Sequence, residues 1–211
     1  MLAKDGRCKV FDASADGYVR GEGGAAIVIM RLNDAEVRRR SAGSDIHGII
    51  RSVVLNHNGI AAAYTAPNGA SQCELLMSAM HQAHVKANDI VYIESHGTGT
   101  KLGDPVEWTA IEEVFLKQRD PSLSPLVMGA VKSNIGHLEA SAGIAGLIKT
   151  LLVLKNLKAP PNLHMNVLNP LITNGLNHAV FPQEITAVGA MSKTICAGLS
   201  SFGSGKLYAN F

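Results

Sequence analysis

The chain has 211 residues, of which 46% are hydrophobic and 17% charged, and its formal net charge is +2. This composition is apolar enough for a folded core and excludes intrinsic disorder, while the balanced charge does not indicate a nucleic-acid-binding surface. No apolar stretch reaches the roughly 20 residues that a membrane-spanning helix needs, and the N-terminus shows no signal-peptide core. We therefore expect a cytoplasmic protein without a membrane span, although the sequence does not exclude an organelle.

Apolar runs rich in β-branched residues alternate with helical patterns along the chain, which is the order typical of an α/β domain. The runs that predict buried strands are residues 25–32, 46–55, 89–93, 126–131 and 194–199. The segments that predict helices are residues 71–85, 104–117 and 138–157, and residues 35–40 predict a short polar helix or a turn. Asp104 and Pro105 have the residue types of a helix N-cap and a first helical position. Gly143 and Gly146 predict that the last helix packs closely against a neighbour.

Two predicted strand-to-helix loops each place a histidine beside glycines. His96 lies in the loop at 94–103, and His137 follows the strand at 126–131. In α/β folds such loops carry ligand sites, because a rigid sheet holds them in place. The two histidines are separated by about one strand–helix–strand unit, which predicts one shared crevice. Two neutral imidazoles there can polarise a single carbonyl oxygen.

Other candidate sites are less well supported. His81 and His84 have the i, i+3 spacing of a helical metal pair, but no acidic or cysteine ligand accompanies them, so we predict no metal site. Residues 21–26 fit the pattern G-x-G-x-x-A, but they precede a predicted strand instead of following one, which argues against a nucleotide enzyme. The three cysteines lie far apart and indicate neither a disulfide framework nor a zinc site, and packing is the better interpretation of each. These cysteines are Cys8, Cys73 and Cys196.

Six segments together indicate a family. They are DGRCKVFDASADGYVRGEGG (5–24), SVVLNHNG (52–59), TAPNG (65–69), ESHGTGTKLGDPVE (94–107), GAVKSNIGHLEASAGIAGLIK (129–149) and GLSSFG (198–203). In order and spacing they resemble the β-ketoacyl synthase (ketosynthase) domain of polyketide synthases, a member of the thiolase fold. The animal-type fatty acid synthase is the alternative within this family. The resemblance implies an incomplete α/β, thiolase-like layered fold with helices packed on mixed sheets, in which residues 1–32 end the N-terminal half of a ketosynthase and residues 33–211 form the C-terminal half.

The resemblance also implies a reaction and its catalytic residues. Ketosynthases take an acyl group onto a cysteine, decarboxylate a malonyl unit on an acyl carrier protein and join the two by a Claisen condensation. His96 and His137 match the two catalytic histidines that bind the thioester oxygen as the enolate forms. Lys132 matches the lysine that orders the site by charge pairing, and Glu139 matches a supporting acid in its network.

Further residues match positions that bind the substrate in the family. Thr98 and Thr100 match hydroxyls that line the pantetheine tunnel. Phe202 belongs to the loop that supplies a backbone N–H to the acyl oxyanion, which places Ser204 at that position. The implied partner is an acyl carrier protein, with a family-type homodimer at full length and no nucleic acid. No cofactor is implied, because the substrates are carried on the phosphopantetheine of the carrier protein.

The sequence departs from the family at two points. The family nucleophile stands in a D-T-A-C-S-S-type segment, and no cysteine of this chain has such a setting; Cys8, in DGRCK, matches a non-catalytic position. After SSFG the family continues with glycines and T-N-A-H, whereas residues 204–211 read SGKLYANF. We therefore expect an acyltransferase-class domain that does not condense substrates as an isolated chain. The alternative hypothesis is a non-catalytic remnant or scaffold that binds a carrier protein.

Overall fold

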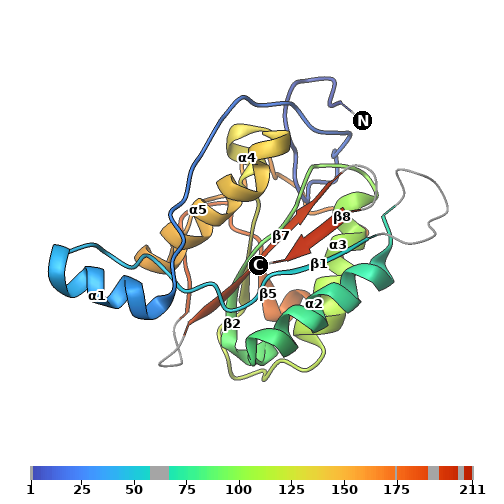
Figure 1. Ribbon diagram of the computed structural model, residues 1–211. Coiled ribbons are helices and arrows are strands. Elements are labelled where there is room, and N and C mark those ends of the chain that lie inside the picture. Colours follow the sequence, from blue (N-terminus) through green and yellow to red (C-terminus); the bar gives the residue numbers. More distant parts are fainter. Residues whose placement is uncertain (1, 58–66, 174, 190–194, 204–206, 211) are drawn as a thin grey trace.

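A computed structural model describes residues 2–57, 67–173, 175–189, 195–203 and 207–210 (Figure 1). The α-helices within these residues are α1 (Leu32–Ala42), α2 (Gly69–Ala83), α3 (Gly103–Ile111), α4 (Lys132–Ile135) and α5 (Ala142–Asn156). The strands are β1 (Val54–His57), β2 (Ile90–Glu94), β3 (Leu126–Gly129), β4 (Lys158–Ala159), β5 (Ala179–Val180), β6 (Thr186–Ala187), β7 (Cys196–Phe202) and β8 (Leu207–Asn210). A π-helical turn, Glu112–Leu116, continues α3.

A mixed six-stranded sheet forms the centre of the fold, in the order β1-β8-β7-β2-β3-β5. The strands β7, β2, β3 and β5 are parallel, whereas β8 is antiparallel to both β7 and β1. In the register of the parallel strands, Glu94 at the end of β2 lies beside Gly129 of β3 and Leu199 of β7. The carboxyl ends of these three strands therefore meet at one edge of the sheet.

Helices cover the parallel part of the sheet on both faces, with α5 on one side and α2 and α3 on the other (Figure 1). Because side chains alternate along a strand, Tyr92 and Val127 pack with Val153 of α5, whereas Ile93 and Met128 belong to the larger cluster on the opposite side. Such two-sided burial explains why the strands read as nearly continuous apolar runs. The predicted α/β layering is confirmed.

Helix α5 approaches the sheet closely because two of its positions lack a side chain. A Cβ atom at Gly146 would lie 2.7 Å from Leu199 Cδ1, and one at Gly143 would lie 3.1 Å from Ser201 Oγ. Both contacts are with β7, the strand on which α5 packs. The prediction that Gly143 and Gly146 permit close packing is confirmed, and this close approach brings α5 within reach of the strand ends.

Several predicted elements agree with the structure within a few residues. The helix predicted at 71–85 is α2, and the side chain of Asn68 caps it by accepting a hydrogen bond from the Ser71 N–H at 3.3 Å. The strands predicted at 89–93 and 126–131 are β2 and β3. The helix predicted at 138–157 is α5, although it begins at Ala142 after a 3-10 turn. The segment before it is not only a loop, because it contains the single helical turn α4.

Two predicted strands are wrong. Residues 25–32 form no strand, and the side chains of Val28 and Ile29 are 85% and 67% exposed. Of the run at 46–55, only its last two residues belong to a strand, β1. Apolar β-branched residues favour a strand only where a neighbour supplies hydrogen bonds and packing. Within the described part of the chain, no strand pairs with residues 25–32.

The final strand extends further than predicted. Residues 194–199 predicted a strand followed by a loop, but β7 continues to Phe202, so Ser200 and Ser201 still pair with β8. The unusual ending of the sequence includes β8, which also pairs with β1. Its backbone therefore forms an antiparallel connection between β7 and β1 despite the departure from the family pattern.

Candidate active site

The candidate site lies where β2, β3 and β7 end. His96 follows β2, His137 follows β3 by way of α4, and Phe202 is the last residue of β7. The imidazole rings of His96 and His137 are 5.6 Å apart between centroids and nearly perpendicular, at 83°. The phenyl ring of Phe202 lies 5.0 Å from the His96 ring. The structure therefore places the two predicted histidines side by side at the carboxyl ends of the parallel strands.

Each histidine accepts a hydrogen bond from the backbone at Nδ1. The N–H of Phe202 donates to His96 Nδ1 at 3.1 Å, and the N–H of Glu139 donates to His137 Nδ1 at 2.9 Å. A ring nitrogen that accepts a hydrogen bond carries no proton, so the neutral imidazole carries its proton on Nε2. Both rings therefore carry an Nε2–H donor, which can bind an oxygen atom.

The surroundings of both histidines favour the neutral form. Burial, followed by the positive charge of Lys132, holds the pKa of His96 well below its usual value of 6.5. The same two causes lower the pKa of His137 to about 4, although the carboxylate of Glu139 opposes the shift. Neither ring is expected to carry a charge at neutral pH, so both remain donors through Nε2 without adding a buried cation.

The peptide of His96 is held at both ends by buried charged groups. The carboxylate of Glu107 accepts the His96 N–H at 2.7 Å and the Gly97 N–H at 2.9 Å. The ammonium of Lys132 donates to the carbonyl oxygen of His96 at 2.5 Å. Glu107 lies in the GDPVE segment of the sequence, but sequence reasoning assigned it no role. Its partners are backbone N–H groups about ten residues away in the sequence, and a pattern of side chains does not predict hydrogen bonds to backbone groups.

Lys132 is surrounded by acids. Burial lowers its pKa, and the carboxylates of Glu94, Glu107 and Asp104 oppose that shift. Burial also raises the pKa of Asp104 to about 6 and that of Glu107 to about 7, against the lowering effect of the backbone N–H groups that they accept. The site is thus built on a buried cluster in which one cation stabilises several costly carboxylates.

The pKa of Glu107 leads to a prediction about pH. A carboxyl whose folded pKa lies above its unfolded value contributes stability that is complete below the unfolded pKa, and this stability is lost as pH rises through the folded pKa. Glu107→Gln removes that loss, but it also replaces one acceptor oxygen with an NH₂ group facing a backbone N–H. We expect the variant to lose most free energy of unfolding, relative to the unmodified chain, near pH 5. This loss should be smaller by roughly 2 kcal/mol at pH 8. Urea unfolding across this range measures the difference, and a pH-independent cost would contradict the assignment.

Thr98 and Thr100 lie in a loop that Asp104 organises. The two threonine hydroxyls are 3.4 Å apart, and Thr100 Oγ1 accepts the N–H of Gly103 at 3.2 Å. The Asp104 carboxylate accepts the N–H groups of Thr98 and Gly99 at 3.2 and 3.1 Å and that of Phe11 at 2.9 Å. The prediction of Asp104 as the N-cap of α3 is wrong, because the helix begins at Gly103 and this carboxylate binds the preceding loop instead.

Glu139 does not lie in the charge network of Lys132. Its carboxylate is exposed and forms an ion pair with Arg20 at 2.7 Å. Glu139 acts on the site through its backbone N–H on His137 and through its charge, which opposes the lowering of the His137 pKa. Among the described residues, the acids that act on Lys132 are Glu94, Glu107 and Asp104, together with the thiol of Cys8. The predicted position of Ser204 lies outside the described residues.

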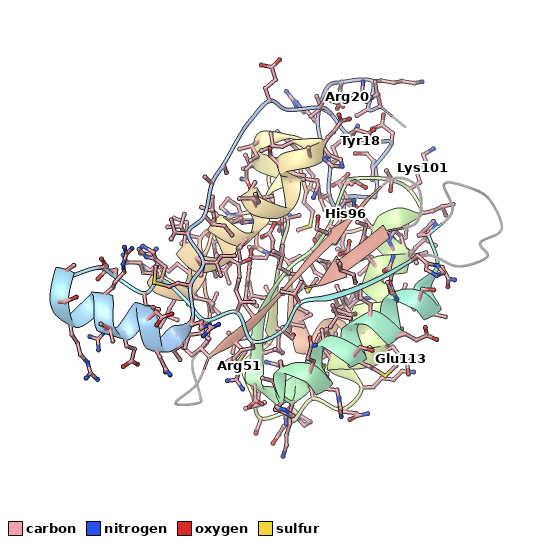
Figure 2. All side chains as sticks on the ribbon, viewed as in Figure 1. Tyr18, Arg20, Arg51, His96, Lys101 and Glu113 are labelled. Carbon is pink, nitrogen blue, oxygen red and sulfur yellow. The ribbon has the colours of Figure 1, made fainter. Side chains whose placement is uncertain are left out.

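The N-terminal segment completes one side of the site. His137 donates its N–H to the Val19 carbonyl at 2.8 Å, and Gly21 donates to the His137 carbonyl at 3.0 Å. The ring of Tyr18 contacts the His137 ring edge-on, with centroids 5.1 Å apart. Figure 2 shows Tyr18 and Arg20 on this segment, above His96. Sequence reasoning did not identify these contacts, which join residues more than a hundred positions apart.

The cysteine candidates behave as packing residues, whereas His81 and His84 are exposed. Burial raises the pKa of all three cysteine thiols, and Cys8 Sγ accepts the Val19 N–H at 3.2 Å, which supports packing roles. The rings of His81 and His84 are 6.4 Å apart between centroids. In the part of the chain that the structure describes, no group of three or more His, Cys, Asp or Glu residues is arranged to hold a metal. Within the same residues, no helix is long and apolar enough to cross a membrane.

Comparison with protein families decides the identity of this arrangement. Residues 47–166 match the model described as "Beta-ketoacyl synthase, C-terminal domain", and residues 1–35 match "Beta-ketoacyl synthase, N-terminal domain". The chain belongs to the β-ketoacyl synthase family. The resemblance carried by the six sequence segments is therefore confirmed.

The curated relatives of this chain include polyketide synthases. The chain is 42% identical over 203 residues to a phenolphthiocerol/phthiocerol polyketide synthase of Mycobacterium tuberculosis, covering 96% of this chain and 9% of the relative. It is also 42% identical over 206 residues to a hybrid PKS-NRPS synthetase of Aspergillus niger, covering 97% of this chain and 5% of the relative. The chain thus spans a small part of the curated relatives that it matches.

Solved ketosynthase structures confirm the fold. The ketosynthase from module 6 of the bacillaene synthase of Bacillus subtilis 168 superposes with a TM-score of 0.91 at 36% identity, covering 100% of this chain and 37% of that one. The oxazolomycin ketosynthase domain OzmH KS7 of Streptomyces albus gives a TM-score of 0.89 at 34% identity, covering 99% and 36% of the two chains. The thiolase-like α/β fold expected for a ketosynthase is confirmed by these similarities.

Proposed function

We propose that this ketosynthase chain carries the decarboxylation part of a polyketide synthase condensing site. The observation that carries the proposal is the pair of neutral imidazoles, His96 and His137, whose Nδ1 atoms each accept a backbone N–H while their Nε2–H groups remain donors. A malonyl thioester on an acyl carrier protein is the substrate that this pair fits. The polyketide synthase relatives support this substrate class.

The chemistry follows from the two donors. When the bond between the α-carbon and the carboxylate of the malonyl unit breaks, CO₂ leaves and its bonding electrons move toward the thioester carbonyl. The oxygen gains negative charge as the enolate forms, and two Nε2–H donors stabilise that charge more strongly than the neutral carbonyl. In condensation, the enolate carbon attacks an acyl thioester and the thiolate of a cysteine leaves. Thr98, Thr100 and the segment at Phe202 and Ser204 are proposed to contact the pantetheine arm and the acyl oxygen.

Acyl transfer requires a nucleophile from outside these 211 residues. None of the three cysteines stands in the family's nucleophile segment, and burial raises the pKa of each thiol, which disfavours the reactive thiolate. The isolated chain is therefore proposed to be inactive in condensation. We further propose a homodimer and a cytoplasmic location for a protein that contains the complete domain, with 1–32 and 33–211 as parts of its two halves.

The proposal is tested with the purified 211-residue chain and malonyl-acyl carrier protein. Intact-mass spectrometry should show slow conversion of malonyl- to acetyl-carrier protein above the rate without the chain, because the His pair stabilises the enolate, whose α-carbon then takes a proton from water. A second reaction with an acyl thioester should add no acyl mass to the chain. An acyl adduct on any cysteine would overturn the nucleophile assignment. Carrier-protein binding without decarboxylation would favour a scaffold function instead.

A further inference from the structure

Glu94 is a completely buried acid at the carboxyl end of β2, two residues before His96. Its Oε1 accepts the N–H of Val131, and its Oε2 accepts the O–H of Tyr92 at 2.5 Å. The same Oε2 forms an ion pair at 2.9 Å with Lys149 of α5, whose side chain is only 10% exposed. One carboxylate therefore connects its own strand, β2, to the β3–α4 junction and to α5.

These contacts connect the two loops of the site. Val131 directly precedes Lys132, and the Lys132 ammonium donates to the carbonyl oxygen of His96. Glu94 therefore determines where the β3–α4 junction lies relative to the end of β2, and with it where Lys132 meets the His96 peptide. The carboxylate of Glu94 also faces the charge of Lys132 through the protein interior. No part of this arrangement touches the Nε2 atoms that the proposed reaction uses.

Lys149, the partner of Glu94 in this ion pair, belongs to α5, a helix that packs close to the sheet. A Cβ atom at Gly146, one turn before Lys149, would lie 3.4 Å from Glu94 Cγ and 2.7 Å from Leu199 Cδ1. Any side chain at this position would therefore move α5 away and lengthen the ion pair. Because Lys149 pairs with Glu94, the position of α5 affects where the end of β2 lies.

Stability alone does not explain two buried charges at this position. Removing two charges from water costs several kcal/mol per ion in order-of-magnitude terms, and a well-packed apolar pair is often as stable or more stable. A buried ion pair does, however, hold a defined geometry, because separating the two charges would leave each of them unpaired in the protein interior. The Glu94–Lys149 pair lies where such a geometry affects the candidate site.

We propose that Glu94 and Lys149 are positioning residues, a buried ion pair through which α5 fixes the distance between the His96 loop and Lys132. The inference rests on the proposed function for its activity readout. It predicts that loss of the pair alters the site without removing any group that contacts substrate.

The test compares Lys149→Met with Lys155→Met, the same substitution at an exposed position of the same helix. We expect Lys149→Met to lower kcat for malonyl decarboxylation about tenfold with little change in KM, because small displacements of positioned groups are costly. We also expect it to shift the side-chain ¹H–¹⁵N signals of His96, and Lys155→Met to do neither. Unchanged His96 signals together with wild-type kcat in Lys149→Met would overturn the proposal.

A second variant separates positioning from folding. Glu94→Gln/Lys149→Met removes both charges, so no unpaired buried ion remains and the chain is expected to fold. A positioning role predicts that this variant keeps the altered His96 signals and reduced kcat even where its unfolding midpoint recovers. Recovery of all three to wild-type values would show a purely structural pair and overturn the proposal. The histidine signals remain informative if the chain shows no decarboxylation, so the failure of the proposed function and the failure of this inference are distinguishable.

Discussion

Replacing His137 with alanine should lower the rate of malonyl decarboxylation about 10²- to 10³-fold, the loss typical of removing one preorganised oxyanion donor. His137 contributes an Nε2–H because its Nδ1 already accepts the Glu139 N–H. The remaining donor, His96, would then face the developing enolate charge alone. Single-turnover conversion of malonyl- to acetyl-carrier protein measures the effect directly, and His96→Ala should show a loss of similar size.

The control for this prediction is His81→Ala, which removes an exposed histidine from α2. Its rate should match that of the unmodified chain. His137→Gln should retain part of the activity, since an amide N–H can partly replace the imidazole donor. If His137→Ala decarboxylates malonyl-carrier protein as fast as His81→Ala does, the imidazole pair does not bind the enolate and the proposed mechanism fails.

Replacing Lys132 with methionine should lower the free energy of unfolding by about 3–5 kcal/mol at pH 8, the range expected when one partner of a buried charge cluster is removed. The carboxylates of Glu107 and Asp104 would lose the cation that stabilises them, whereas Glu94 would keep its ion pair with Lys149. Lys132→Met also removes the hydrogen bond to the His96 carbonyl, so decarboxylation should fall in parallel. Urea unfolding and the single-turnover assay measure the two effects.

Lowering the pH should reduce the loss in free energy of unfolding that Lys132→Met causes. The folded pKa values of Asp104 and Glu107, about 6 and 7, already lie above those of the free side chains, and losing the cation raises them further. Groups shifted in this direction lose stability as pH rises through the folded pKa, so the variant should be less destabilised at pH 5.5 than at pH 8. The control is Lys101→Met at an exposed position labelled in Figure 2, which should cost little at either pH. An equal cost for Lys132→Met and Lys101→Met would contradict the charge-cluster assignment.

The parts of the fold that sequence patterns predicted are those with strong local signals. Helix α2 has both an apolar spacing and the Asn68 cap, and β2 and β3 are short apolar runs bounded by polar loops. The run at 25–32 has an equally strong strand pattern, yet it is exposed and unpaired within the described residues. Strand formation depends on a neighbour that local residues do not specify.

Some residues of the candidate site were likewise predicted from the sequence and others were not. Its two histidines and Lys132 were identified from motifs, whereas Glu94 and Glu107 were not, and Glu139 was assigned to a lysine that it does not contact. The partner of a carboxylate is known only once the chain is folded. Glu107 binds backbone N–H groups, and Glu94 binds the Val131 N–H and Lys149. Glu139 pairs with Arg20. Residue type and spacing do not encode such pairings.

The amino-acid composition predicted a folded chain with balanced charge, the alternation of apolar runs with helical patterns predicted the α/β class, and the motifs by themselves determined its family and the loops that carry its histidines. Only the tertiary structure decided the protonation of those histidines, because it brings the Phe202 and Glu139 N–H groups to Nδ1 of each ring. It also decided which acids surround Lys132. The physical reason is that tautomers, pKa values and ion pairs depend on interatomic distances and on burial. These distances arise only in the folded chain, where the parallel strands end at one edge of the sheet.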